Sequence, residues 1–469
     1  MKLRNWILVL VTVVACCLLF SACANTEDDE IKESESVSET ESQTGETALS
    51  LTIDGKDISE YKIVYAHSPL EKKISATGKT IGEDLSAYLL GENIAYDFDY
   101  QTAVRLQQLI QEKTGKTLEL VKDSSGEAGD YEILVGQTLR METASLKDWL
   151  KYDTYTCKLD GTRYVICGKD YGTTWHAVDA WEKLLTDTLA AGKTELDMKT
   201  AGDLSGTYEM KKVACVGDSI TRGSQAVNAL GSNAETKKWG SDSVRDTYYE
   251  EYLAYPCVAQ RNLWQEYVIY NFGVGGTSMS HKDLYTETKK YQTCLQYSNR
   301  NDFDYDLVLI MLGTNDATDS GKSAWSQTEK KAYLDATRSL VNVIKAGSPD
   351  AQFVLMNVPH RCDGDAPLVS DASARETQLE TVQTLAGEGQ SILYYDMERF
   401  NKDHMTADPT KEGAAGVDEK KLHEDYYNIK QGANDTTHFN YKGYYVTGME
   451  MVTLMEHLLN NGEATEYLW

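Results

Sequence analysis

The chain has 469 residues, of which 41% are hydrophobic and 25% are charged, and its formal net charge is −27. This length exceeds one ordinary core, so we expect two domains with additional segments. A chain this acidic repels phosphate backbones, and without a patch dense in lysine and arginine it is not expected to bind nucleic acid. The same charge disfavours tight binding to anionic polymers, unless a basic pocket provides a local positive charge.

The first residues predict an export signal, because a basic start precedes an apolar run and small residues before Cys23. The ending Leu19-Phe20-Ser21-Ala22-Cys23 resembles a bacterial lipobox, although Phe20 stands where leucine is more usual. The resemblance implies that residues 1–22 are a lipoprotein signal peptide and that Cys23 is lipidated. The protein would then be exported and anchored to the cell membrane, facing outside the cytoplasm. A plain signal peptide and an uncleaved anchor helix are the alternatives.

Residues 23–50 predict an acidic tether. After Cys23 the segment is rich in aspartate and glutamate, with a single lysine and no aromatic residue. Such a composition cannot bury a core, so the segment is expected to be disordered. We expect it to hold the folded part away from the membrane surface.

Residues 51–207 predict a smaller, ancillary α/β domain. Two stretches have helical periodicity, 99–116 and 175–189, and Asp160-Gly161 is a hairpin turn signal. Short apolar runs predict strands at 61–66, 117–123, 131–138, 155–161 and 163–170. This order of elements favours a mixed sheet with helices packed on it.

The N-terminal region also carries a family resemblance. An amphipathic helix is followed by "TGKTLELV", "YEILVGQT" and "RYVICGKDYGTTWHAVDAWEKLL". This succession resembles the non-catalytic N-terminal α/β domain found beside glycoside hydrolase domains of the α-glucuronidase and hexosaminidase type. The resemblance implies a structural domain, and no catalytic residue is assigned to it.

Residues 208–469 predict a second domain of a different kind. Strand-like runs are "KKVACVGDS", "EYVIYNFGV", "YDLVLIMLGTND", "QFVLMNVP" and "SILYYDM", and helical stretches at 256–266, 326–347, 373–387 and 440–461 separate or follow them. Apolar strands alternating with helices predict a parallel sheet covered on both faces. Ligands of such sheets bind beyond the carboxyl ends of the strands, where Ser219, Gly276 and Asn315 are expected.

Ser219 is a candidate nucleophile, and the chain offers it a base. A serine hydroxyl needs a neighbouring histidine, which in turn needs a carboxylate to orient it. Among the 8 histidines only His438 has an aspartate, Asp435, three residues before it, and that spacing would let both side chains face the same way on one turn. Asp218 is interpreted as a residue that stabilises the loop. The alternative for Ser219 is a turn or capping serine.

Oxyanion donors are predicted at two further strand ends. "NFGVGGTS" ends in a glycine-rich turn, where the Gly276 amide can approach a ligand closely. "LGTNDA" offers the side-chain amide of Asn315. Taken singly, Gly276 is as well explained by a tight turn and Asn315 by a helix cap.

Four blocks together resemble one family. "GDSIT" (217–221), "NFGVGG" (271–276), "GTND" (313–316) and "DTTH" (435–438) occur in the order of the SGNH hydrolases, also called GDSL-like esterases. The resemblance implies a three-layer α/β/α flavodoxin-like fold and a Ser-His-Asp esterase without a cofactor. It implies the following roles: nucleophile Ser219; oxyanion hole Ser219, Gly276 and Asn315; general base His438; and orienting carboxylate Asp435.

Two long connections, 224–256 and 400–434, are expected to bear on the substrate. Their aromatic residues would line a sugar site by stacking or would only pack the connections onto the domain. We name as candidate substrate-binding residues Trp239, Tyr248, Tyr249, Tyr426 and, after a predicted strand, His360. For His360 an ordinary loop histidine is the alternative.

The remaining motifs indicate neither a metal nor a cofactor. No histidine or cysteine has zinc spacing, and no phosphate or dinucleotide loop follows a strand. The cysteines beyond the signal are interpreted mainly as small core residues, with one disulfide left open.

The sequence therefore predicts an exported serine esterase whose partner is an acylated carbohydrate. Two alternatives remain: an acyl hydrolase of lysophospholipids or thioesters, and a surface glycan-binding lipoprotein that does not catalyse.

Overall fold

The computed structural model describes residues 51–66, 98–125, 127–196, 204–223, 254–280, 304–319, 323–359, 369–405, 426–428 and 435–469. The predictions for residues 1–50, Trp239, Tyr248, Tyr249 and His360 lie outside the described residues. The predicted domain boundary at residue 207 stays a prediction.

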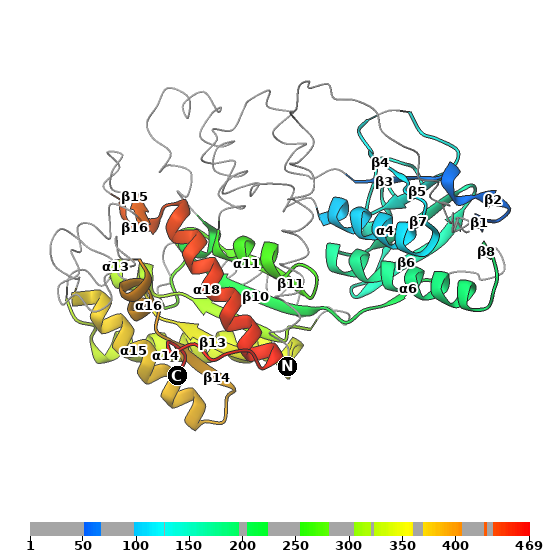
Figure 1. The fold of residues 1–469 in the computed structure, drawn as a ribbon. Coiled ribbons are helices and arrows are strands. Elements are labelled where there is room, and N and C mark those ends of the chain that lie inside the picture. Colours follow the sequence, from blue (N-terminus) through cyan, green and yellow to red (C-terminus); the bar gives the residue numbers. More distant parts are fainter. Residues whose placement is uncertain are drawn as a thin grey trace, which may run out of the picture. The chain divides into compact units, whose positions relative to one another are not determined.

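The N-terminal region builds a six-stranded sheet in the order β4-β3-β5-β7-β6-β9 (Figure 1). Its strands are β3 (Lys62–Tyr65), β4 (Glu119–Lys122), β5 (Glu132–Val135), β6 (Thr154–Asp160), β7 (Arg163–Gly168) and β9 (Gly206–Thr207). Strands β4, β3, β5 and β7 are parallel, whereas β6 is antiparallel to both β7 and β9. The prediction of a mixed sheet is confirmed. A small separate sheet joins β1 (Thr52–Ile53), β2 (Lys56–Asp57) and β8 (Glu195–Leu196), and the single turn η1 (Ile58–Glu60) follows β2.

Two long helices, α4 (Phe98–Thr114) and α6 (Tyr171–Ala190), cover one face of this sheet. Helix α6 begins where Asp170 and Thr173 cap each other's backbone amides. The core on this face packs the apolar stripes of both helices against the inward residues of the strands. The opposite face carries a smaller apolar cluster, packed partly by α5 (Leu146–Trp149).

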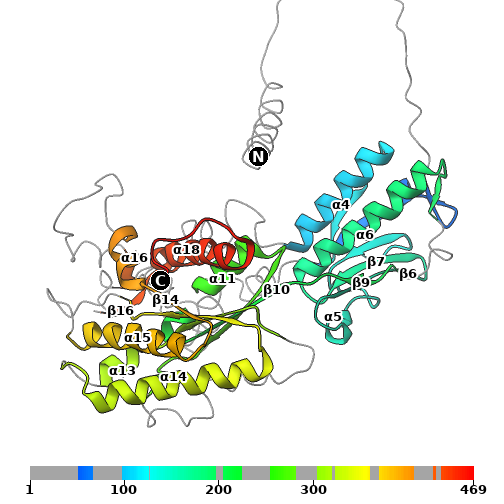
Figure 2. The same cartoon turned by 90° about the horizontal axis from the view of Figure 1, so that it is seen from below.

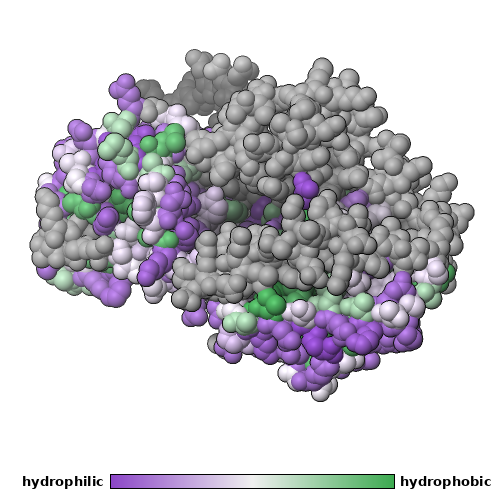
Figure 3. All heavy atoms as spheres, turned by 180° about the vertical axis from the view of Figure 1, so that it is seen from behind, coloured by the Kyte–Doolittle hydropathy of each residue, from purple (hydrophilic) through white to green (hydrophobic). Residues whose placement is uncertain are grey.

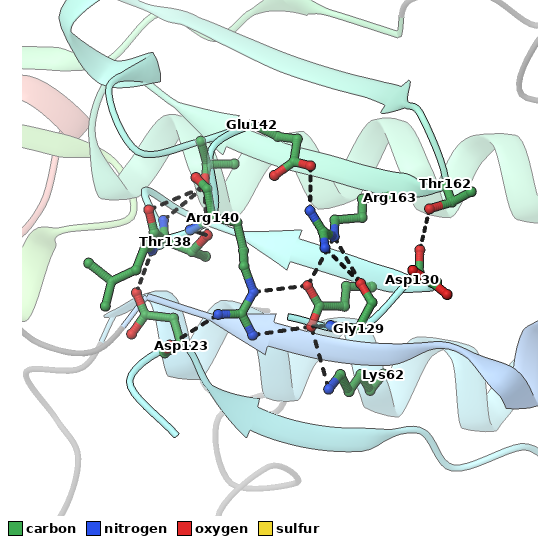
Figure 4. Close-up of polar contacts among 12 residues, drawn as sticks. Lys62, Asp123, Gly129, Asp130, Thr138, Arg140, Glu142, Thr162 and Arg163 are labelled. Carbon is green, nitrogen blue, oxygen red and sulfur yellow. Dashed lines mark hydrogen bonds and ion pairs between the residues drawn. The ribbon is translucent and has the colours of Figure 1, made fainter. Parts of the chain in front are cut away.

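On that opposite face a buried carboxylate lies among cations (Figure 4). Glu132, fully buried, contacts Arg140 at 3.0 Å, Arg163 at 3.2 Å and Lys62 at 3.4 Å. Its Oε1 also accepts a hydrogen bond from the Gly129 amide at 2.8 Å. Burial alone raises the pKa of Glu132, but the hydrogen bonds from Arg140 and Gly129 and the nearby positive charges outweigh it and hold that pKa below its ordinary value. The carboxylate therefore stays ionised and ties three segments of the sheet together.

The C-terminal region builds a five-stranded sheet in the order β11-β10-β12-β13-β14, with every pair parallel. Its strands are β10 (Lys211–Gly217), β11 (Tyr267–Gly273), β12 (Leu307–Met311), β13 (Gln352–Met356) and β14 (Ile392–Tyr395). Numbered from the first strand, this is the 2-1-3-4-5 order of flavodoxin-like folds. The predicted parallel sheet and fold class are confirmed.

Helices cover both faces of the parallel sheet (Figure 2). On one face lie α11 (Tyr255–Leu263), α16 (Met397–His404) and α18 (Tyr441–Asn460), and on the other α14 (Gln327–Gly347) and α15 (Val369–Gly387). Alternate residues of each strand enter the two cores, as at Cys215 and Val216 of β10. Two short helices, α8 (Ser219–Arg222) and α13 (Thr314–Asp319), follow strand ends.

Most of the described surface in the view of Figure 3 is hydrophilic, and apolar residues form small areas. None of the helices within the described residues is long and apolar enough to cross a membrane. The four cysteines in the described part, Cys157, Cys167, Cys215 and Cys257, form no disulfide with one another.

Candidate active site

Ser219 is the first residue of α8 and follows β10 almost directly. Asp218 is the N-cap of α8: its Oδ1 accepts a hydrogen bond from the Ile220 amide at 2.8 Å. The cap holds the sharp change from strand to helix, which is the loop-stabilising role interpreted for Asp218. The first amides of a helix have no intrahelical acceptor, and the Ser219 N–H has none within the described residues.

The end of β10 packs closely against α8. A Cβ on Gly217 would lie 1.9 Å from Thr221 Oγ1, so only glycine lets the end of β10 meet the helix. Thr221 Oγ1 lies 3.2 Å from the hydroxyl of Tyr255. Burial raises the pKa of Tyr255 and of neighbouring Cys215 well above their ordinary values, so both stay protonated. Neither group competes with Ser219 as a nucleophile.

The end of β11 forms the predicted glycine-rich turn. The Thr277 amide donates to the Val274 carbonyl at 3.2 Å, and Gly276 between them has φ +77°. A positive φ at this position of a turn favours glycine. The Gly276 N–H has no acceptor in the described part of the chain.

The end of β12 places Asn315 next to this turn. Asn315 Nδ2 donates to the Thr277 carbonyl at 2.8 Å, which leaves its second N–H for another acceptor. Asp316, fully buried, accepts hydrogen bonds from the amides of Met279 and Ser280, both at 2.7 Å. Two adjacent residues of α13 thus hold the loop that follows Gly276.

His438 meets Ser219 across the site: its Nε2 lies 2.7 Å from the Ser219 Oγ. His438 belongs to β16 (Asp435–Phe439), which pairs antiparallel with β15 (Tyr427–Asn428), with a shift of register between Tyr427 and Asn428. The expectation that Asp435 and His438 lie on one turn is wrong, because the segment is a strand. The side chain of Asp435 lies outside the described atoms.

Tyr426 is the one candidate substrate-binding residue within the described part. It is half-buried, packs against the core under α18, and its carbonyl accepts a hydrogen bond from the Asn440 amide at 2.8 Å. This placement agrees with the alternative that aromatic residues of the connections pack onto the domain. Within the described residues no group of three potential ligands could hold a metal ion.

Sequence reasoning did not single out Asp316 or Arg222. The signal for Asp316 was its place in "GTND", directly after Asn315. For Arg222 it was the distance of three residues from Ser219, one helical turn.

A parallel sheet of flavodoxin order, with a serine and a histidine in hydrogen-bond contact at its carboxyl edge, defines the class: this is a serine esterase. Residues 215–446 match the GDSL-like Lipase/Acylhydrolase family. These residues form a GDSL-like lipase/acylhydrolase domain, whose activity is the hydrolysis of acyl esters.

Solved structures similar to about half of the chain include a family two carbohydrate esterase from Clostridium thermocellum in complex with cellohexaose, at 15% identity, covering 54% of this chain and 67% of that chain, with a TM-score of 0.36. A second is the M. smegmatis aryl esterase, at 15% identity, covering 53% and 100%, with a TM-score of 0.33. A third is a carbohydrate esterase family 2 enzyme from Corynascus thermopiles, at 18% identity, covering 54% and 69%, with a TM-score of 0.34. No match was found among curated proteins.

Proposed function

We propose that this protein is an exported, membrane-anchored esterase that removes O-acyl groups, chiefly acetyl, from carbohydrate. The observation that carries the catalytic part is the 2.7 Å contact between His438 Nε2 and Ser219 Oγ. This distance is that of a hydrogen bond through which a histidine takes the proton of an attacking serine.

In the proposed reaction Ser219 Oγ attacks the acyl carbon while His438 Nε2 takes its proton. The tetrahedral intermediate collapses, and His438 returns the proton to the departing sugar hydroxyl. A water molecule then attacks the acyl-serine with His438 again as base, which releases the carboxylic acid. Asp435 would orient the imidazole.

The negative oxygen of the intermediate needs donors that are already in place. The amides of Ser219 and Gly276 have no acceptor among the described residues, and Asn315 keeps one side-chain N–H. The three donors come from the ends of neighbouring strands, β10, β11 and β12. We assign them the oxyanion hole.

The carbohydrate part of the proposal rests on sequence. It is supported by the export signal, by the aromatic content of the two long connections and by the resemblance of the N-terminal region to partners of glycoside hydrolases. An acyl hydrolase of lysophospholipids or thioesters is the rival within the same class, and a glycan-binding protein without activity is the rival outside it.

The test is acetate release by the chain without residues 1–23 from a panel of acetylated polysaccharides and from a neutral aryl acetate. We expect release from at least one polysaccharide, with kcat lowered about 10⁴-fold or more in Ser219→Ala. Ser205→Ala, which removes a hydroxyl from the N-terminal region, is the matched control and should retain activity.

A lysophospholipid, followed by fatty-acid release, is added to the panel for the rival. Activity on it and on the aryl acetate, but on no polysaccharide, would replace the carbohydrate substrate with a lipid. No activity on any ester would overturn the catalytic proposal.

A further inference from the structure

Arg222 lies one helical turn from the nucleophile. It is the last residue of α8, whose first residue is Ser219. Side chains three positions apart on a helix lie on the same face. The sequence therefore places a guanidinium on the side of α8 that carries the Ser219 hydroxyl.

The space between the two side chains is open at Gly275. A Cβ built on Gly275 would lie 3.8 Å from Arg222 Nη1 and 3.9 Å from Ser219 Cβ. Both are ordinary van der Waals distances, so among the described atoms one methyl group would fit there. The cation and the nucleophile thus border the same gap over the turn at the end of β11.

The backbone of Arg222 is held firmly. A Cβ on Gly273 would lie 2.1 Å from the Arg222 nitrogen, so the end of β11 packs directly on the last turn of α8. After Arg222 the chain leaves the helix through Gly223, whose φ is +88°. The backbone from which the Arg222 side chain extends therefore has a fixed position relative to the end of β11.

Within the described residues the Arg222 guanidinium contacts no carboxylate and donates no hydrogen bond to another group of the protein. By contrast Arg140, Arg163 and Arg338 each contact a glutamate. The chain has 73 acidic and 46 basic side chains, so most cations can find a carboxylate partner. A guanidinium that lies near the nucleophile and has no such partner among the described residues suggests a role in binding. A planar guanidinium matches a carboxylate in both shape and charge.

We propose that Arg222 binds a carboxylate of the substrate next to the scissile ester, so that the enzyme prefers acylated carbohydrates built from uronic acids over neutral ones. This inference rests on the proposed function. Arg222 would also provide a local positive charge for an anionic polymer, which the acidic chain as a whole would repel.

Two substrate pairs that differ only in charge test the preference. One is 3-acetoxybenzoate and its methyl ester; the other is O-acetylated polygalacturonate before and after methyl esterification. In Arg222→Met we expect kcat/KM for the anionic member of at least one pair to fall about tenfold or more, while the neutral member changes less than about twofold. Arg222→Lys should keep part of the preference for the anionic member, because lysine carries the positive charge but lacks the planar guanidinium that can make two parallel hydrogen bonds to a carboxylate.

Arg338→Met, which removes the same charge from α14, is the matched control and should change neither member. Equal losses on both members in Arg222→Met would indicate a merely structural role, and no loss on either would also overturn the inference. If instead the wild type fails on every ester, or Ser219→Ala keeps full activity, the proposed function fails and not Arg222 alone.

Discussion

Because Gly273 has no Cβ, β11 can approach closely the helix α8 that carries Ser219. Its Cβ would collide with backbone atoms of Arg222 and Thr221, which cannot rotate away. Gly275, two residues later, would place its Cβ in ordinary contact with side-chain atoms only. Neither glycine has a positive φ in the structure, so the difference between them is one of space.

We therefore predict that Gly273→Ala lowers the free energy of unfolding by about 2 kcal/mol or more, because the backbone must shift. Gly275→Ala should lower it by less than about 1 kcal/mol. Urea unfolding followed by circular dichroism measures both, and Gly275→Ala is the control for adding one methyl group. Equal costs would contradict the close packing of β11 on α8.

At the scale of elements, Glu132 at the start of β5 joins β3, β7 and the segment after β5 through Lys62, Arg163 and Arg140. Its pKa is held below the ordinary value, so the folded state binds this proton less readily than the unfolded chain. The resulting stability is fully present above the unfolded pKa of about 4.3 and is lost as the pH falls through the lower, folded-state pKa.

Glu132→Gln should therefore lower the free energy of unfolding by about 3 kcal/mol at pH 7, because it leaves buried cations uncompensated. The deficit relative to the wild type should begin to shrink below the unfolded pKa of about 4.3, where the unfolded wild-type chain starts to bind the proton, and should shrink further as the pH falls through the folded-state pKa. Urea titrations of both proteins at pH 7 and below pH 4 measure this change in the free energy of unfolding. Glu119→Gln, exposed at the start of β4 in the same sheet, should cost less than about 0.5 kcal/mol at either pH. A pH-independent deficit in Glu132→Gln would contradict the role of the charge.

At the scale of the whole molecule, the net charge of −27 limits how the protein can reach a membrane. Anionic lipid surfaces attract basic segments and repel acidic ones, and the predicted tether is acidic. Attachment through charge is therefore unfavourable. The proposed anchoring depends on the lipid at Cys23.

We predict that Cys23→Ser moves the protein out of the detergent phase when membranes of a bacterial host that processes lipoproteins are extracted and phase-separated. The wild type should enter the detergent phase, because acyl chains contribute about 0.8 kcal/mol per buried CH₂. Cys257→Ser is the control for loss of a thiol and should partition like the wild type. A wild type in the aqueous phase would contradict lipidation.

The sequence by itself determined the elements and the candidate pair at the active site. Apolar runs of strand length between amphipathic helices predicted the parallel sheet, since periodicity depends on neighbouring residues in the chain. Ser219 and His438 were recognisable because catalysis by serine requires a base, whatever their separation in sequence.

Only the tertiary structure decided how these residues meet. It made residues 435–439 a strand where a turn was expected, joined Asn315 to the Thr277 carbonyl, and placed the Arg222 side chain beside Gly275. Glu132 likewise has partners from other strands, which no local pattern marks. Distances between remote segments depend on how side chains of the whole fold pack, and that information is spread over residues too far apart in the chain for periodicity or spacing to express.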